Sequence, residues 1–107
     1  MKFYPMKPTR NHEELALFFT AIGHKRRLMI CDILLNHGSR GLSFELLQAK
    51  TKMAASTLGH HLGQMDKGGV LRRRTKGRET WFSMDFARLN TIPAGFSNSC
   101  QNSILNS

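Results

Sequence analysis

The sequence predicts a mainly α-helical domain that carries one small β-hairpin. Apolar residues recur at helical spacing in four segments between residues 11 and 69. Two strand-like runs follow, at 70–75 and 80–84, and a short loop that contains a glycine separates them. A length of 107 residues fits one compact domain, and a hydrophobic content of 40% provides one modest core.

A glycine separates the first two predicted helices. The first is expected to begin near Asn11, where Asn11 and Glu14 resemble a capping box, and to end at Gly23. The second is expected over residues 24–35, and its apolar residues lie on more than one side, so it should be a central helix. The apolar positions of the first helix are Leu15, Phe18, Phe19 and Ile22.

Two further helices follow a turn at residues 36–41. Ser43 is the expected N-cap of a short third helix, and the fourth helix ends at Gly68 and Gly69. The expected buried face of the fourth helix consists of Leu58, Leu62 and Met65. Its opposite face consists of Ser56, Thr57, His60 and Gln64.

The last part of the domain combines the hairpin with a fifth helix. A loop at 76–79 joins the two strands, and Asp85 is the expected cap of the fifth helix. Pro93 and Gly95 should shorten or kink this helix. A winged helix-turn-helix domain has this order of elements: four helices, a strand, a wing, a second strand and a final helix.

These elements divide the chain into three expected parts. Residues 1–10 form a flexible basic arm with two prolines and three basic side chains. Residues 11–96 form the winged helix-turn-helix DNA-binding domain. Residues 97–107 form a polar tail without charged residues, which is a candidate for disorder because it has little to bury.

The charge of the chain points to a polyanionic partner. The formal net charge is +9, from 16 Lys and Arg residues against 7 Asp and Glu residues, and this excess favours nucleic acid. No membrane partner is expected, because the longest apolar run, residues 15–22, is too short to span a bilayer and the N-terminus lacks the apolar segment of a signal peptide. Two cysteines do not form a disulfide framework, so we expect a cytoplasmic protein.

The fourth helix has the pattern of a DNA-recognition helix. Such a helix docks one apolar face on its own core and presents short polar side chains to base edges in the major groove. Gly59 and Gly63 each cost the helix ~1 kcal/mol relative to alanine. They are expected where a larger side chain would collide with DNA or with a neighbouring helix. The predicted DNA contacts of this helix are Ser56, Thr57, His60 and Gln64.

The hairpin has the composition of a basic wing. Its basic side chains are expected to contact phosphates and the minor groove, and to supply much of the affinity and its salt dependence but little sequence reading. The predicted wing contacts are Arg72, Arg73, Arg74, Lys76 and Arg78. An inverted repeat in double-stranded DNA is the expected target of a dimer with this architecture.

Two stretches carry a resemblance to the ArsR/SmtB family of repressors. "LFFTAIGHKRRLMICDIL" (residues 17–34) resembles the family's first two helices, and "STLGHHLGQMDKGGVLRRRTKGRETWFSMD" (residues 56–85) resembles its recognition helix and wing. The resemblance covers about residues 13–92. It implies a homodimeric transcriptional repressor that is released by a metal, metalloid or redox signal, with a dimer interface on the first and last helices. The corresponding residues here are Leu15, Phe18, Phe19, Phe86 and Leu89.

The family's metal sites have no counterpart in this sequence, so no cofactor is expected. The third helix lacks the cysteine cluster of one branch, and after Asp85 the chain lacks the histidine and acidic ligands of another. Cys31 and Cys100 are candidate residues for arsenic or thiol-based sensing, which related branches perform with cysteines in similar elements. The simpler interpretation of Cys31 is a small buried hydrophobe.

The histidines favour structural and DNA-contacting roles over a metal site. His60 and His61 are adjacent, so on a helix they point about 100° apart and do not readily share one ion. His61 lies on the apolar side of its helix, which indicates a hydrogen-bonded structural role or a phosphate contact, whereas His60 is the better base contact.

Two other classes of function compete with a sequence-specific regulator. A non-specific or architectural nucleic-acid binder on the same fold, without an effector response, is the alternative. An enzyme is not expected, because the chain has no Ser/His/Asp arrangement of useful spacing and no phosphate-binding loop.

Overall fold

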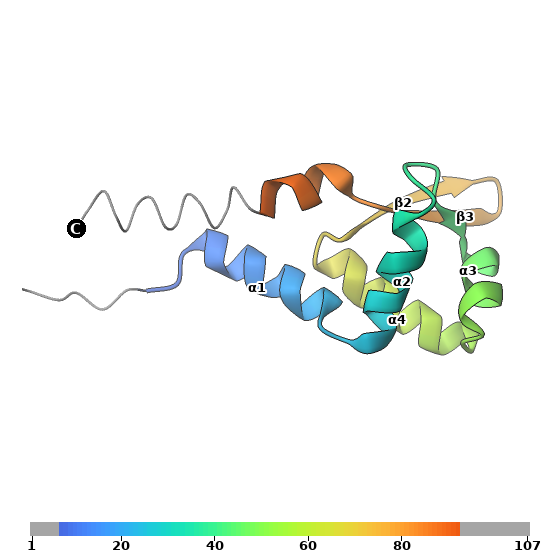
Figure 1. Ribbon diagram of the computed structural model, residues 1–107, viewed down its shortest axis with the longest axis horizontal. Coiled ribbons are helices and arrows are strands. Elements are labelled where there is room, and N and C mark those ends of the chain that lie inside the picture. Colours follow the sequence, from blue (N-terminus) through green and yellow to red (C-terminus); the bar gives the residue numbers. More distant parts are fainter. Residues whose placement is uncertain (1–6, 93–107) are drawn as a thin grey trace, which may run out of the picture.

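The computed structural model describes residues 7–92 and confirms the predicted winged helix-turn-helix architecture (Figure 1). Four helices and a small antiparallel sheet, whose first strand lies between the second and third helices, are followed by a further helical segment at 86–92. Three predictions lie outside the described residues: residues 1–6 of the arm expected at 1–10, the effects of Pro93 and Gly95, and the polar tail at 97–107. The elements are α1 (Arg10–Ile22), α2 (Lys25–Leu35), β1 (Leu42–Ser43), α3 (Phe44–Thr51), α4 (Ala55–Lys67), β2 (Leu71–Lys76) and β3 (Glu79–Met84).

The sheet contains one strand more than the sequence predicted. Strand β1 pairs with β3 and gives the strand order β1-β3-β2. The pair Lys76 and Glu79 belongs to the ladder, so the loop predicted at 76–79 is wrong and the turn consists of Gly77 and Arg78. Gly77 has a φ of +64°, and glycine at the first position of a two-residue turn matches the twist of a hairpin.

The core lies between the helices and the inner face of the sheet. Its most deeply buried side chains come from α2, α3, α4 and the segment before β2: Ile30, Leu34, Leu47, Leu58, Met65 and Val70. Helices α1 and α4 cross closely at Gly68, where an added Cβ would lie 2.8 Å from the carbonyl oxygen of Leu17. Gly68 therefore does more than end the helix, because it allows the backbones of α1 and α4 to approach each other.

Two of the predicted caps are present, and one is wrong. The backbone N–H of Leu46 donates to Ser43 Oγ over 3.2 Å, and that of Arg88 donates to Asp85 Oδ1 over 3.0 Å. The capping box predicted at Asn11 and Glu14 is wrong, because the N-cap of α1 lies two residues before Asn11.

Thr9 is the N-cap of α1. It has an extended backbone and forms a capping box with His12: His12 N–H donates to Thr9 Oγ1 over 3.3 Å, and Thr9 N–H donates to His12 Nδ1 over 3.0 Å. Glu14 lies instead between Arg10, at 3.4 Å, and Arg88, at 3.9 Å. These ion pairs link the first turn of α1 to the helical segment at 86–92.

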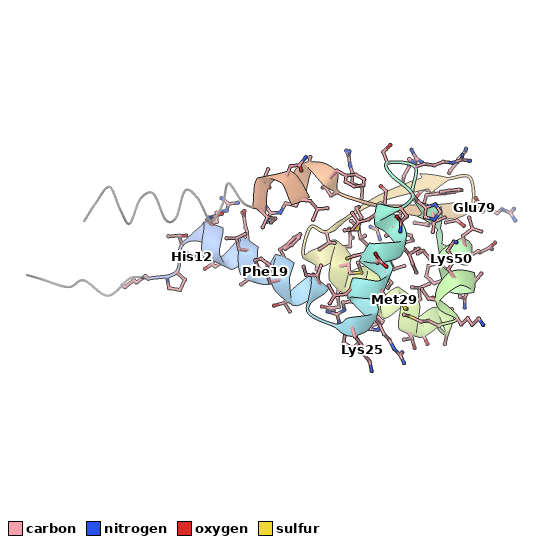
Figure 2. All side chains as sticks on the ribbon, in the orientation of Figure 1. His12, Phe19, Lys25, Met29, Lys50 and Glu79 are labelled. Atoms are coloured by element: carbon pink, nitrogen blue, oxygen red, sulfur yellow. The ribbon has the colours of Figure 1, made fainter. Side chains whose placement is uncertain are left out.

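Helix α2, predicted as a central helix with apolar residues on more than one side, packs against three elements but buries only one of its sides. Its buried residues are Ile30, Cys31 and Leu34. Leu28 is 53% exposed and Leu35 is 49% exposed, and Met29 on the same helix is 40% exposed (Figure 2). The neighbours of α2 in the described chain, α1, α4 and β3, cover one side of the helix and leave the other to solvent.

Candidate nucleic-acid interface

Helix α4 has the two faces that the sequence predicted. Leu58, Leu62 and Met65 are buried at 0 to 2% exposure and hold the helix on the core. The opposite face is open to solvent at Ser56 and His60 and half-buried at Thr57 and Gln64. The polar residues predicted to contact bases therefore lie on one accessible strip of this helix.

The glycines of α4 lie on its open side. An added Cβ at Gly59 or at Gly63 would meet nothing within 4 Å. The described chain thus places no neighbouring helix at these positions, which removes one of the two reasons expected for glycine there. Because these residues have no side chains, the backbone of α4 itself can approach an external surface.

The N-terminus of α4 lacks a side-chain cap. Its N-cap residue is Ala54, and no side chain of this residue accepts a hydrogen bond from the first turn. The backbone N–H groups of a first helical turn have no partner within the helix, and together with the helix dipole they favour anions.

His61 joins α4 to α2 and, through Arg27, to the end of α1. Arg27 Nε donates to His61 Nδ1 over 3.1 Å, and Arg27 Nη1 donates to the carbonyl oxygen of Thr20 over 3.2 Å. The His24 ring lies 4.8 Å from the His61 ring, centroid to centroid. With 6% exposure, His61 fits the hydrogen-bonded structural role rather than the phosphate contact.

The surroundings of His61 favour its neutral form. Burial lowers the pKa of His61, and the charges of His24 and Arg27 lower it further. The accepting Nδ1 of a neutral ring matches the donor of Arg27. Sequence analysis missed Arg27, because its partner lies 34 residues away and leaves no local pattern.

The wing residues that the sequence grouped together lie on two faces of the hairpin. Successive strand residues point to opposite faces, so Arg72, Arg74 and Lys76 share one face and Arg73 lies on the other. Arg73 Nη2 lies 3.8 Å from Asp66 Oδ2 near the end of α4. Arg78 occupies the turn, and all five basic side chains are exposed.

The described residues offer no metal site, and Cys31 is not poised as a thiolate. No group of three or more His, Cys, Asp or Glu side chains that could hold an ion occurs in the part of the chain that the structure describes. Cys31 is 8% exposed, and burial raises the pKa of its thiol to about 11. Cys100, the second candidate effector residue, lies outside the described residues.

The residues expected at a dimer interface differ in accessibility. Leu15 and Phe18 are already buried within the single chain, at 6% and 3% exposure. Phe19 (labelled in Figure 2) is 44% exposed, and its ring is T-shaped to the Phe18 ring, with 5.5 Å between the ring centroids. Phe86 and Leu89 are half-buried. A dimer contact on these helices stays a prediction, with Phe19 as its most accessible residue.

No protein-family model and no curated protein matches the chain. Solved structures do match it. An ArsR-like transcriptional regulator from Rhodococcus sp. RHA1 superposes with a TM-score of 0.73 at 20% identity, over 92% of this chain and 90% of that one. The homodimeric winged helix-turn-helix domain Mb0332 from Mycobacterium bovis, a possible ArsR-family regulator, gives 0.64 at 22% identity, over 85% and 84%.

A third match has a higher sequence identity. A predicted DNA-binding transcriptional regulator from E. coli is 27% identical, with a TM-score of 0.58 over 81% of this chain and 90% of that one. Within residues 7–92, no helix combines the length and the apolar character needed to cross a membrane. The shared architecture over most of each chain shows that this chain has the winged helix-turn-helix fold of the ArsR-family transcriptional regulators.

Proposed function

We propose that the chain is a DNA-binding transcriptional regulator of the ArsR type, which acts in the cytoplasm as a homodimeric repressor at an inverted repeat. The observation that carries this proposal is the open strip of α4. This strip combines exposed polar side chains with two glycines that no part of the described chain covers. The E. coli and M. bovis structures with this fold are themselves described as DNA-binding.

Helix α4 would enter the major groove and read base edges. The imidazole of His60 and the amide of Gln64 each offer a donor and an acceptor, and the hydroxyls of Ser56 and Thr57 serve at shorter range. Gly59 and Gly63 would let the helix lie deep in the groove. The uncapped first turn at Ala54 would contribute N–H donors to a nearby phosphate.

The wing would contribute affinity rather than sequence reading. Arg73 lies on the face of the hairpin that meets α4, and Arg78 lies in the turn. Both side chains would pair with phosphates, so binding would weaken steeply as salt is raised. The Arg73–Asp66 pair is exposed and long at 3.8 Å, so it holds Arg73 only weakly against a phosphate.

Catalysis is not part of this proposal, and the matched structures are named as regulators rather than enzymes. In a homodimer the two α4 helices would reach half-sites about 34 Å apart, one turn of DNA.

The alternative, a general nucleic-acid binder on the same fold, is favoured by the net charge of +9. It differs from the proposal in one measurable property, which is the ratio of specific to non-specific affinity.

Fluorescence anisotropy across a salt series tests the proposal. Purified protein is titrated into its own upstream DNA and into unrelated DNA of equal length. We expect tighter binding to the upstream DNA, and we expect the double variant His60→Ala/Gln64→Ala to lose this difference while keeping non-specific affinity. Asn90→Ala, which removes an exposed amide from the segment at 86–92, is the matched control. Equal binding of the wild type to both DNAs would favour the general binder instead.

A further inference from the structure

A surface hollow of about 420 Å³ lies between the outer face of the hairpin and the loop that follows α2. We call it the Arg–Trp hollow. Its volume falls within the range of small-molecule binding sites, about 300 to 1,000 Å³. One wall is formed by the loop residues Ser39 and Arg40, and the hairpin contributes Arg72, Arg73, Arg74, Trp81 and Ser83.

Strand register gathers the hairpin residues of this hollow. Arg72 pairs with Ser83 and Arg74 pairs with Trp81 across β2 and β3, so all four side chains share one face. Arg73, which also lines the hollow, directs its guanidinium to the opposite face, toward Asp66. The hollow thus lies on the side of the sheet away from the face that meets α4, and it is separate from the open strip of α4.

Trp81 is held in place by groups on either side of it. Its Nε1–H donates to Glu79 Oε2 over 3.1 Å. Arg40 Cζ lies 5.9 Å from the centroid of the Trp81 ring, and the Arg40 carbonyl accepts a 3.4 Å hydrogen bond from Arg74 Nη2. The Arg40 guanidinium therefore lies over the indole ring, and this prearranged pair connects the loop to the hairpin.

Within residues 7–92, the hollow carries three arginines that form no ion pair with a carboxylate. The ion pairs of this part of the chain involve Arg10, Arg73 and Arg88. Arg40, Arg72 and Arg74 form none there, and Glu79 is engaged with the Trp81 indole. In Figure 2, nitrogen-tipped side chains gather along this edge of the sheet, near Glu79. Like charges side by side disfavour the folded state unless an anion joins them.

The side chains of the hollow are suited to bind a phosphate group and a nucleobase. Guanidinium groups bind phosphate oxygens through paired hydrogen bonds, and a phosphate monoester offers three such oxygens. Tryptophan and arginine planes are surfaces on which nucleobases stack. A nucleoside phosphate carries both groups at short separation.

We propose that the Arg–Trp hollow binds a nucleoside phosphate, with the base stacked against Trp81 and Arg40 and the phosphate held by Arg72 and Arg74. This is a small-molecule site in addition to the DNA-binding surface proposed above. It does not depend on DNA binding, because its geometry is complete within one chain.

Intrinsic fluorescence provides a direct test, because Trp81 is the one tryptophan of the chain. The full chain, without DNA, is titrated with AMP, and separately with adenosine and with inorganic phosphate, and Trp81 emission is excited where adenine does not absorb. We expect saturable quenching by AMP at lower concentration than by either fragment. Arg40→Gln should weaken AMP binding by about 10-fold, the loss expected when the base loses one of its two stacking partners.

Arg26→Gln is the matched control, because it removes the same charge from an exposed position on α2 outside the hollow. It should bind AMP as the wild type does. Circular dichroism shows whether each variant is folded, and calorimetry on Arg72→Gln gives a second measure that does not use Trp81. Equal affinities for AMP and inorganic phosphate, an unchanged spectrum in AMP, or equal losses in Arg40→Gln and Arg26→Gln would each overturn the proposal.

If the hollow instead binds phosphates of duplex DNA, Arg40→Gln would weaken DNA binding while AMP has no effect on Trp81. That result would overturn the nucleotide site and leave the proposed DNA-binding function in place. Conversely, AMP binding by a chain that does not discriminate its upstream DNA would support the hollow and count against the sequence-specific regulator.

Discussion

Arg27 on α2 donates from Nε to Nδ1 of His61 on α4 across 3.1 Å. A second hydrogen bond, from Arg27 Nη1 to the carbonyl oxygen of Thr20, extends the link to the end of α1. One side chain therefore connects the helix proposed to read DNA with both helices of the N-terminal half. The link requires an unprotonated Nδ1 on His61, because a protonated ring offers no acceptor to the guanidinium.

Stability should therefore depend on the protonation of His61. Its pKa is lowered in the folded chain by burial and by the charges of His24 and Arg27. The unfolded chain then binds the proton more tightly, so this contribution to stability is complete above about pH 6.5, the ordinary pKa of histidine, and is lost as the pH falls below it. We expect the thermal midpoint to decrease on going from about pH 7.5 to about pH 5.5, and to decrease less in His61→Gln.

Thermal unfolding followed by circular dichroism at both pH values measures this difference. His37→Gln is the matched control, because it replaces a histidine that is not part of the Arg27–His61 contact. If both variants showed the same reduced pH dependence, the effect would not belong to His61.

Cys31 should be chemically inert in the folded protein. The thiolate is the reactive form, and burial raises the pKa of Cys31 to about 11, with 8% of the residue exposed. In a Cys100→Ser background, Ellman's reagent at about pH 8 should react far more slowly with the native chain than with the chain in denaturant. A native rate equal to the denatured rate would contradict this and would restore Cys31 as a candidate sensor.

The features predicted from sequence are those that local patterns encode. The buried stripe of α4 follows from apolar residues three and four positions apart, and the caps at Ser43 and Asp85 follow from single residues at helix starts. Strand β1 was missed because two residues, Leu42 and Ser43, cannot show an alternating pattern. Its existence depends on pairing with Phe82 and Trp81, about 40 residues later in the chain.

The parts of the site that the sequence did not predict also depend on contacts between residues far apart in the chain. Arg40 and Trp81 come together only because the loop after α2 folds beside the hairpin. The division of the wing arginines between two faces was encoded locally, since alternate residues of a strand face opposite ways, but it requires the exact register of β2. A run of arginines by itself does not show which of them meet α4.

The open glycines of α4 should trade stability against DNA binding. Alanine at Gly59 or Gly63 has room, because an added Cβ meets nothing within 4 Å. Each substitution should raise the free energy of unfolding by up to ~1 kcal/mol through helix propensity. The same methyl group would reach toward the groove, so we expect weaker binding to the upstream DNA. Fluorescence anisotropy measures the DNA affinity, and chemical denaturation measures the free energy of unfolding.

Gly68→Ala is the contrasting variant on the same helix end. An added Cβ there would lie 2.8 Å from the Leu17 carbonyl oxygen, so this variant should be less stable than the wild type. If Gly59→Ala and Gly63→Ala were more stable and bound DNA as tightly as the wild type, the open strip of α4 would not be the DNA-contacting surface.

Two wing arginines, Arg73 beside α4 and Arg78 in the turn, should account for part of the salt dependence of DNA binding. Arg73→Ala/Arg78→Ala removes two proposed phosphate contacts, so the slope of log affinity against log salt should become shallower by about 2. Upstream and unrelated DNA should lose affinity to the same extent, because phosphate contacts carry no sequence information. The control is Arg10→Ala, which removes one positive charge far from the wing. The guanidinium of Arg10 pairs with Glu14 at the start of α1. A slope that stays unchanged in the double variant, or that changes equally in Arg10→Ala, would show that net charge rather than contact by the wing sets the salt dependence.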